Sequence, residues 1–381
     1  MLKGKIVFNR NELSGAFGDI GTDFPLIMGM ILINNLDPAS TLIMFGAMQV
    51  FTAFMYGIPM AVQPFKAMAT IMLTQRLSKD LLYAAGFSLG LVMLILSITG
   101  LLDKLANCIP KAVIRGIQFG LGISLASLGL RNYVLSEGIE GYILAALSFS
   151  IIMLLLGNRK FPPAIIVIII GILYALIFHV DISEVGQHIK LATPQMHGLT
   201  LHNIILGFLL LGLPQIPLSL GNSIFATKQT ITDFFPEKKV TVRKIGITYS
   251  IMNLINPFFS GIPTCHGAGG LSGHYAFGAR TGGSLVIYGS MYIFLGLFLN
   301  SNFSYIAHIF PMPMLGIILF FEGVFLMRLI QDIMDSKKDL LIVLMIGIIC
   351  LSLQYGYVIG IIAGILIYNL DKLNIIKLIK E

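Results

Sequence analysis

Stretches of at least ten residues without Lys, Arg, Asp or Glu recur along almost the whole chain. Examples lie at residues 89–101, 165–177, 204–213, 285–299 and 340–353. Charged residues make up 11% of the 381 residues, against about 25% in an average soluble domain. The pattern therefore predicts an all-α polytopic membrane protein without a separate soluble domain.

Apolar segments joined by short loops predict fourteen spans, seven in each half of the chain. The predicted spans are residues 12–33, 41–57, 66–76, 81–101, 112–130, 140–156, 162–179, 202–221, 244–259, 266–277, 283–299, 311–329, 339–353 and 355–370. The third and the tenth are too short to cross a bilayer alone and are predicted to be half-helices. An odd number of spans in each half inverts the second half relative to the first.

The distribution of basic residues predicts which loops between these spans lie on the cytoplasmic side of the membrane. With the N-terminus in the cytoplasm, 20 of the 25 Lys and Arg residues fall on the cytoplasmic side, four fall outside, and Lys66 lies within the membrane. Cytoplasmic loops carry an excess of Lys and Arg, so both termini are predicted to be cytoplasmic, in the cell membrane. Residues 227–244 are predicted to form a basic cytoplasmic loop. The net charge of +7 is not concentrated on one element, which argues against a nucleic-acid partner.

Two segments interrupt the apolar pattern in the same way, 204 positions apart. Residues 57–68 read Gly-Ile-Pro-Met-Ala-Val-Gln-Pro-Phe-Lys-Ala-Met, and residues 261–271 read Gly-Ile-Pro-Thr-Cys-His-Gly-Ala-Gly-Gly-Leu. Each predicts an extended stretch followed by a half-helix that starts near the bilayer midplane. Free N–H groups at helix N-termini attract anions. Matched interruptions in two halves are typical of the binding site of a transporter with internal repeats.

Polar side chains at both interruptions are candidate ligands for an anion. Lys66 supplies a positive charge and Gln63 an amide donor, while Thr264 and His266 supply further donors. Gly267 lets a helix N-terminus approach a ligand closely. The alternative interpretation is that Lys66 reaches to a membrane interface and that His266 is only a hydrogen-bonded packing residue. No HExxH motif and no metal-ligand spacing among the three cysteines is found, so no metal site is predicted.

Two acids lie in the first predicted helix. Asp19 and Asp23 are four residues apart and are predicted to share one helix face. An acid inside a spanning helix costs several kcal/mol unless it faces a cavity or a partner, so these residues are predicted to offset Lys66 or to carry a coupling proton. The alternative is a purely structural ion pair with Lys66, with Glu12 solvated at the membrane edge.

The eighth predicted span carries neutral polar residues in the corresponding position. Asn222 lies 204 positions after Gly18 and is predicted to support the site, although a structural role is equally open. Two prolines in this span are predicted to kink it. In the twelfth span, Glu322 is predicted to pair with Arg328 or with a neighbouring hydroxyl group.

Four motifs resemble the molybdate transporter family, a relative of the sulfate permeases. They are Gly-Asp-Ile-Gly-Thr-Asp-Phe-Pro at 18–25, Val-Gln-Pro-Phe-Lys-Ala at 62–67, Cys-His-Gly-Ala-Gly-Gly-Leu at 265–271 and Phe-Gly-Ala-Arg-Thr-Gly at 277–282. The resemblance covers almost the whole chain and implies the fold shared with uracil permease, two inverted repeats of seven segments. Residues 1–104 and 200–300 would then form a core domain, and residues 105–199 and 301–381 a gate domain.

The resemblance also implies a function. It implies secondary active import of a tetrahedral oxyanion, molybdate first, by an elevator-like shift of the core against the gate, without enzyme activity or a cofactor. Sulfate or tungstate as the substrate, and an anion channel of the same fold, are the alternatives; proton coupling and a homodimer are left open. Carried onto this chain, the substrate site would use Gln63, Lys66, Thr264, Cys265, His266 and Gly267, with Asp19 and Asp23 nearby.

Overall fold

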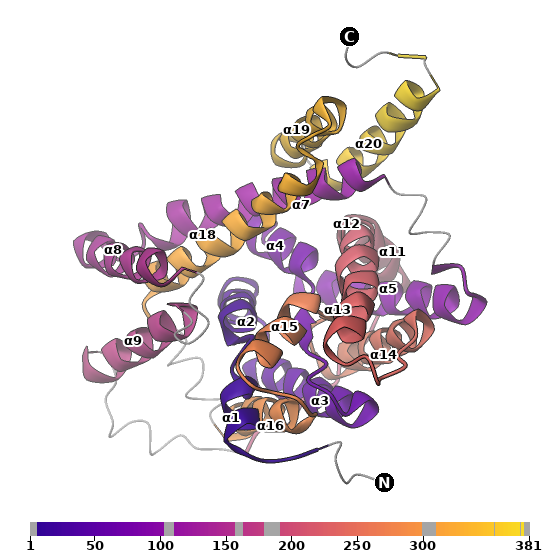
Figure 1. Ribbon diagram of the computed structural model, residues 1–381. Helices are drawn as coiled ribbons and strands as arrows, with labels where there is room; N and C mark the ends of the chain where they lie inside the picture. The colour runs from indigo at the N-terminus through magenta and orange to yellow at the C-terminus, as the bar shows by residue number, and fades with distance from the viewer. Residues whose placement is uncertain are drawn as a thin grey trace.

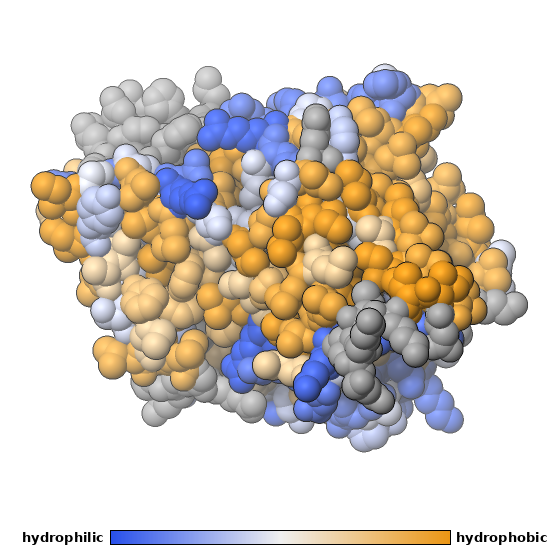
Figure 2. Space-filling model, turned by 90° about the horizontal axis from the view of Figure 1, so that it is seen from above, coloured by the Kyte–Doolittle hydropathy of each residue, from blue (hydrophilic) through white to orange (hydrophobic). Residues whose placement is uncertain are grey.

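The computed structural model describes residues 6–102, 110–156, 163–178, 191–298, 310–353, 355–373 and 375–376, which are mostly helical. Six of the described helices are long and apolar enough to cross a membrane, or seven if the bent pair α1 (Arg10–Ala16) and α2 (Ile20–Asn34) forms one span. Figure 2 shows a broad hydrophobic band between two rims where hydrophilic residues gather. The protein therefore has a multi-pass membrane fold, and the count of fourteen spans stays a prediction.

Helices occupy each span position predicted in the first half of the chain. After α1 and α2 come α3 (Pro38–Tyr56), α4 (Lys66–Gln75), α5 (Lys79–Thr99), α7 (Lys111–Leu128), the π-helical η1 (Gly129–Tyr133), α8 (Gly138–Leu155) and α9 (Pro163–Phe178). Side-chain caps set the start of two of them: Asp37 accepts from the N–H of Ser40, and Ser78 from that of Leu81. Helix α3 ends at Gly57, whose φ of 63° favours glycine.

The second half has a matching succession of helices. They are α11 (Leu201–Gly207), η3 (Phe208–Gly212), α12 (Leu213–Leu218), η4 (Ser219–Ala226), α13 (Thr227–Phe234), α14 (Val242–Ile255), η5 (Asn256–Phe259), α15 (Ala268–Ala276), α16 (Gly283–Phe298), α18 (Met312–Arg328), η6 (Leu329–Ile333), α19 (Lys337–Ser352) and α20 (Gly356–Lys372). The short helices predicted after the two Gly-Ile-Pro segments thus lie at α4 and α15. Their depth in a membrane stays a prediction.

The first predicted helix is bent rather than continuous. Helices α1 and α2 meet at an angle of 42°, and Asp19 occupies the N-cap position of α2. Gly18 lies at this bend, where its backbone approaches that of Gly273 in α15 so closely that an added methyl group would overlap with it. The predicted helix is thus broken just before Asp19. Asp19 and Asp23 are still one turn apart at the start of α2, because the N–H of Asp23 donates to the carbonyl of Asp19 at 3.1 Å.

The eighth predicted span is longer than expected. Residues from Leu201 to Phe234 form one helical run of 34 residues, so the first part of the predicted loop at 227–244 is helical. Pro214 and Pro217 have no N–H to donate. The helix widens into the π-helical segments η3 and η4 on either side of them, which lets it continue past the missing donors.

The helices form two groups, which Figure 1 shows as a diagonal layer above a more compact cluster. In the layer, α7 packs against α18 and α19, and α8 and α20 extend it. In the cluster, α3 packs against α16, and α5 against α14. Small residues allow close approach within both groups: Gly122 meets Gly323 in the layer, and Gly46 meets Gly289 in the cluster. Such contacts are common between membrane helices.

A two-stranded antiparallel sheet lies in the cluster, and each strand leads into a short helix. Strand β1 (Val62–Pro64) precedes α4, and strand β2 (Thr264–His266) precedes α15, with Gln63 opposite Cys265. The sheet therefore brings the beginnings of two short helices together from distant parts of the sequence.

On the outer edge of each strand, one carboxamide side chain forms hydrogen bonds with the backbone N–H and C=O groups of a strand residue. Gln49 of α3 donates to the carbonyl of Val62 at 2.7 Å and accepts from its N–H at 3.1 Å. Asn253 of α14 donates to the carbonyl of Thr264 at 2.6 Å and accepts from its N–H at 3.0 Å. Such pairing removes open backbone groups that a membrane interior does not tolerate.

Candidate anion-binding site

A cavity of about 500 Å³ lies at the N-terminus of α4, between the two groups of helices. Helices α4, α12 and α15 contribute to it from one side, and α7 and α18 from the other. Its polar lining comes from Gln63, Lys66, Lys111, Arg115, Gln118, Asn222 and Glu322. Three predicted site residues, Gln63, Lys66 and Asn222, therefore meet at one cavity.

The N-terminus of α4 is held by a glutamine from the kinked helix. Gln215 Oε1 accepts from the backbone N–H of Ala67 at 3.0 Å and of Met68 at 3.4 Å. Its amide nitrogen donates to Ser219 Oγ at 3.2 Å. A neutral acceptor thus satisfies these amides, and the full positive charge at this helix end is that of Lys66.

Lys66 forms an ion pair across the cavity wall. Its Nζ lies 3.5 Å from Glu322 Oε2, and the two side chains are 24% and 12% exposed. Thr22 donates its hydroxyl to Glu322 Oε1 at 3.1 Å. The expected pairing of Glu322 with a neighbouring hydroxyl group is therefore found, whereas Arg328 donates to Gln331.

Gln63 connects the cavity to a buried carboxylate. Its amide nitrogen donates to both oxygens of Asp19, at 2.9 and 2.8 Å. The carboxylate in turn lies against Gly270 in the first turn of α15, and the Gln63 amide oxygen lies against Gly267. A side chain at either glycine would overlap with these groups. Asp19 therefore orients Gln63 beside the positive end of α15.

Asp23 is fully buried and lies apart from the cavity lining. Its Oδ2 accepts from the hydroxyl of Tyr288 at 3.3 Å, and Tyr288 lies 3.2 Å from the hydroxyl of Tyr292. The other carboxylate oxygen has no hydrogen-bond partner among the described residues. Such a group is costly in an apolar interior unless it is neutralised.

The side chains of β2 are buried behind the cavity rather than in its lining. Thr264 Oγ1 accepts from Asn256 at 3.3 Å. His266 Nε2 lies 2.8 Å from Thr248 Oγ1, and its ring meets Tyr56 edge-on. These contacts hold the strand in place. Direct contact of the substrate with Thr264, Cys265, His266 or Gly267 stays a prediction.

Three cavity residues on α7 were not singled out from the sequence. Lys111, Arg115 and Gln118 line the cavity, and the first two were counted only among the 20 basic residues predicted on the cytoplasmic side. Arg115 donates to both oxygens of Asp332, at 2.9 and 2.5 Å, and Lys111 Nζ lies 2.8 Å from Asp332 Oδ2. The spacing of four residues between the two cations, which places them on one helix face, was the available signal.

Among the side chains that line the cavity, positive charge exceeds negative charge. Lys66, Lys111 and Arg115 supply three cations, and Glu322 supplies one carboxylate. Amide groups of Gln63 and Asn222 complete the lining. Within the described ranges, no group of three His, Cys, Asp or Glu side chains is placed to hold a metal ion. The arrangement suits a small anion.

Solved structures of anion transporters share this fold. The transmembrane domain of a cyanobacterium bicarbonate transporter, BicA, matches 95% of this chain and 98% of its own length, with a TM-score of 0.64 and 15% identity. The murine Solute Carrier 26 family member A9 anion transporter in the inward-facing state matches 97% of this chain and 70% of its own, with a TM-score of 0.70 and 14% identity. At these identities the likeness establishes the fold alone.

Sequence relatives are more specific. Molybdate transporters 2 and 1 of Arabidopsis thaliana are each 32% identical to this chain, covering 96% of it and 88% and 90% of their own lengths. Molybdate transporter 1 of Chlamydomonas reinhardtii is 23% identical and covers 92% of this chain and 90% of its own length. Residues 11–125 and 207–326 match the family described as molybdate transporter of the MFS superfamily. The chain therefore belongs to the molybdate transporter family.

Proposed function

We propose that this protein is a secondary active transporter that imports a tetrahedral oxyanion, and that this oxyanion is molybdate. Family membership supports transport of such an anion. The observation that carries the site is the cavity at the start of α4, where Lys66 lies beside Gln63 and Asn222. An ammonium group and amide donors are suited to the distributed charge of an oxyanion.

Each predicted site residue has a distinct proposed role. Lys66 supplies the charge that attracts the oxyanion, and Gln63 and Asn222 supply polar contacts. Asp19 keeps Gln63 in position through its two hydrogen bonds. The position of α15 behind the site is set by the strand residues Thr264, Cys265 and His266 and by Gly267. Asp23 is a buried acid and the proposed carrier of a coupling proton.

We propose that the chain consists of two inverted repeats of seven segments. The shift of 204 positions that relates Gly57 to Gly261 also relates Gln49 to Asn253, and each of these two carboxamides pairs with the strand of its own half. The compact cluster in Figure 1 contains α3, α5, α14 and α16, which belong to the proposed core of residues 1–104 and 200–300. The diagonal layer contains α7, α8, α18, α19 and α20, which belong to the proposed gate of residues 105–199 and 301–381.

A second cavity supports alternating access. It has a volume of about 550 Å³ and lies at the other end of α4, with Gln75, Ser124 and Tyr355 in its wall. A helix of ten residues rises about 15 Å, so α4 separates the two cavities. In the predicted orientation, the cavity at Lys66 opens to the cytoplasm, where Lys111 and Arg115 lie, and the second opens outside. An elevator-like shift of the core would carry Lys66 from one side to the other.

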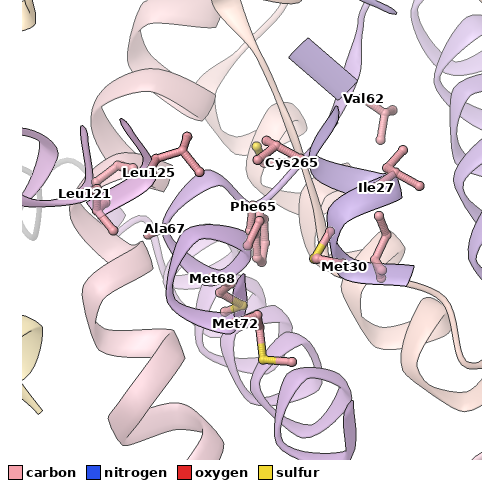
Figure 3. Close-up of a cluster of buried hydrophobic side chains, with 14 of the residues drawn as sticks. Ile27, Met30, Val62, Phe65, Ala67, Met68, Met72, Leu121, Leu125 and Cys265 are labelled. Atoms are coloured by element: carbon pink, nitrogen blue, oxygen red, sulfur yellow. The ribbon is translucent and has the colours of Figure 1, made fainter. Parts of the chain in front are cut away.

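Apolar packing between the cavities favours a carrier over a channel. Figure 3 shows Met68 and Met72 of α4 in one cluster with Leu121 and Leu125 of α7, and all four side chains are buried. A continuous apolar barrier excludes hydrated anions. Sulfate and tungstate are the alternative substrates, because they share the shape and charge of molybdate and differ mainly in size.

Uptake by the purified protein in proteoliposomes tests the proposal. Labelled molybdate should enter saturably, under a proton or anion gradient, and should be inhibited by tungstate or sulfate. Replacing Lys66 by Ala should weaken apparent affinity by roughly tenfold or more, since a hydrogen bond to a charged group contributes about 1.5–3 kcal/mol. Lys79→Ala, at the exposed start of α5, is the matched control. Non-saturable flux, or equal affinity in both variants, contradicts the proposal.

A further inference from the structure

Glu322 is the carboxylate that lines the proposed substrate cavity from the gate side. It belongs to α18, yet both of its contacts are with the other group of helices: Lys66 of α4 at 3.5 Å and Thr22 of α2 at 3.1 Å. It also lines a smaller cavity of about 240 Å³ beside α2, α8 and α9. The side chain therefore has open space on two sides and room to change its partner.

The ammonium group of Lys66 has two partners in this proposal, the carboxylate of Glu322 and the substrate oxyanion. Lys111 and Arg115 already pair with Asp332, whereas Lys66 lies at the start of α4, three residues after Gln63. Its partner in this structure is Glu322. A divalent oxyanion bound at Lys66 would lie close to this carboxylate, and like charges a few ångström apart repel strongly where water is scarce.

The two acids on α2 do not compete in the same way. Asp19 accepts both of its hydrogen bonds from Gln63, and Asp23 is buried against Tyr288. Neither carboxylate lines the cavity. A ligand bound at Lys66 can therefore replace the carboxylate of Glu322, whereas the carboxylates of Asp19 and Asp23 keep their hydrogen bonds.

We propose that Glu322 is an internal competitor for the substrate and sets the affinity of the site. The carboxylate neutralises Lys66 while the cavity is empty, and a bound oxyanion displaces it from the ammonium group. Because the pair also connects the core to the gate, its release on binding frees the core to move. This inference rests on the proposed function, since it takes the oxyanion to bind at Lys66.

Binding of molybdate to the purified protein, measured by titration calorimetry, tests the inference. The variant Glu322→Gln removes the competing charge and should bind molybdate roughly threefold to tenfold more tightly, the range expected for a partly exposed ion pair. The matched control, Glu140→Gln, removes an exposed carboxylate from α8 and should bind like the parent protein. Unchanged or weaker binding by Glu322→Gln overturns the inference.

Two further variants separate competition from other effects. In a Lys66→Met background, Glu322→Gln should give no gain, because the shared ammonium group is gone; a gain that persists shows general repulsion and overturns the inference. Thr22→Val keeps the carboxylate of Glu322 but removes the hydroxyl group that donates a hydrogen bond to it. It should also tighten binding, by a smaller factor, and it covers the case in which Glu322→Gln does not fold.

The outcomes also distinguish this inference from the proposed function. If Lys66→Ala weakens molybdate binding while Glu322→Gln and Thr22→Val leave it unchanged, the substrate site stands and the competitor role fails. If the parent protein binds none of molybdate, tungstate and sulfate, the proposed function fails and the inference fails with it.

Discussion

The side chain of Glu12 in α1 connects this helix to the residues at the start of α16. Its carboxylate accepts from the backbone N–H groups of Arg280 and Thr281 at 2.9 Å and of Ser284 at 3.0 Å. The residue is only 2% exposed. The expectation that Glu12 is solvated at the membrane edge was therefore wrong, because its partners lie far away in the sequence.

We expect Glu12→Gln to destabilise the protein by about 3 kcal/mol, because hydrogen bonds to a buried charge are worth more than those to an amide. Gln keeps one side-chain oxygen, so either the N–H of Ser284 at the start of α16 or the N–H groups of Arg280 and Thr281 before it would lose their acceptor. Thermal unfolding in detergent checks this, with the exposed Glu140→Gln as the control. A melting temperature equal to that of the control contradicts the structural role.

Adjacent glycines in α15 provide a second test at the residue scale. A methyl group at Gly270 would overlap with the Asp19 carboxylate and with Ala61, whereas one at Gly269 would meet no atom within 4 Å. Gly270→Ala should lower stability by about 1–3 kcal/mol through overpacking. Gly269→Ala should be neutral or slightly stabilising, because Ala favours helices. Similar melting temperatures for the two variants would rule out this packing of Asp19 on α15.

The sequence was informative about Lys66, Gln63 and Asn222, which do line one cavity. Proline, glycine and charge inside an apolar chain are local signals that need no knowledge of the fold. The bond between Gln63 and Asp19 and the position of Arg115 in the same wall depend on which helices become neighbours. A single sequence contains no direct signal for such contacts.

Among the elements, the packing of α4 on α7 is the proposed barrier between the two cavities. Met68 and Met72 are four residues apart on α4, as are Leu121 and Leu125 on α7, so each pair forms one face of its helix. Leu125→Ala should cost about 3 kcal/mol and should open an uncoupled anion leak. Efflux from proteoliposomes without a driving gradient measures the leak.

Leu147→Ala serves as the control for the barrier, because this leucine is 45% exposed on α8. It should leave efflux unchanged. If anion efflux is the same for Leu125→Ala and Leu147→Ala, the cluster of α4 and α7 is not the barrier between the cavities.

Element positions were more predictable than element shapes. The starts of α4 and α15 follow from local proline and glycine signals. The bend before Asp19 arises where Gly18 meets Gly273, and the long run through Pro214 depends on π-helical turns. The bend thus depends on tertiary packing, and the long run depends on π-helical turns that proline does not signal in the sequence.

For the whole molecule, the account predicts that the two cavities open in alternation. Ile114 lines the first cavity and Ser124 the second, both on α7. Single cysteines at these positions should therefore react with a membrane-impermeant thiol reagent at rates that molybdate changes in opposite directions, relative to the parent protein. Changes in the same direction at both positions would contradict movement of the core against the gate.

Diffraction from crystals grown with tungstate tests whether an oxyanion binds at the start of α4. Tungsten scatters anomalously, so its position is found independently of the protein density. We expect one peak in the cavity lined by Gln63, Lys66 and Asn222, with an oxyanion oxygen about 3 Å from Lys66 Nζ. No peak at saturating tungstate, or a peak outside this cavity, would show that the substrate does not bind at the start of α4.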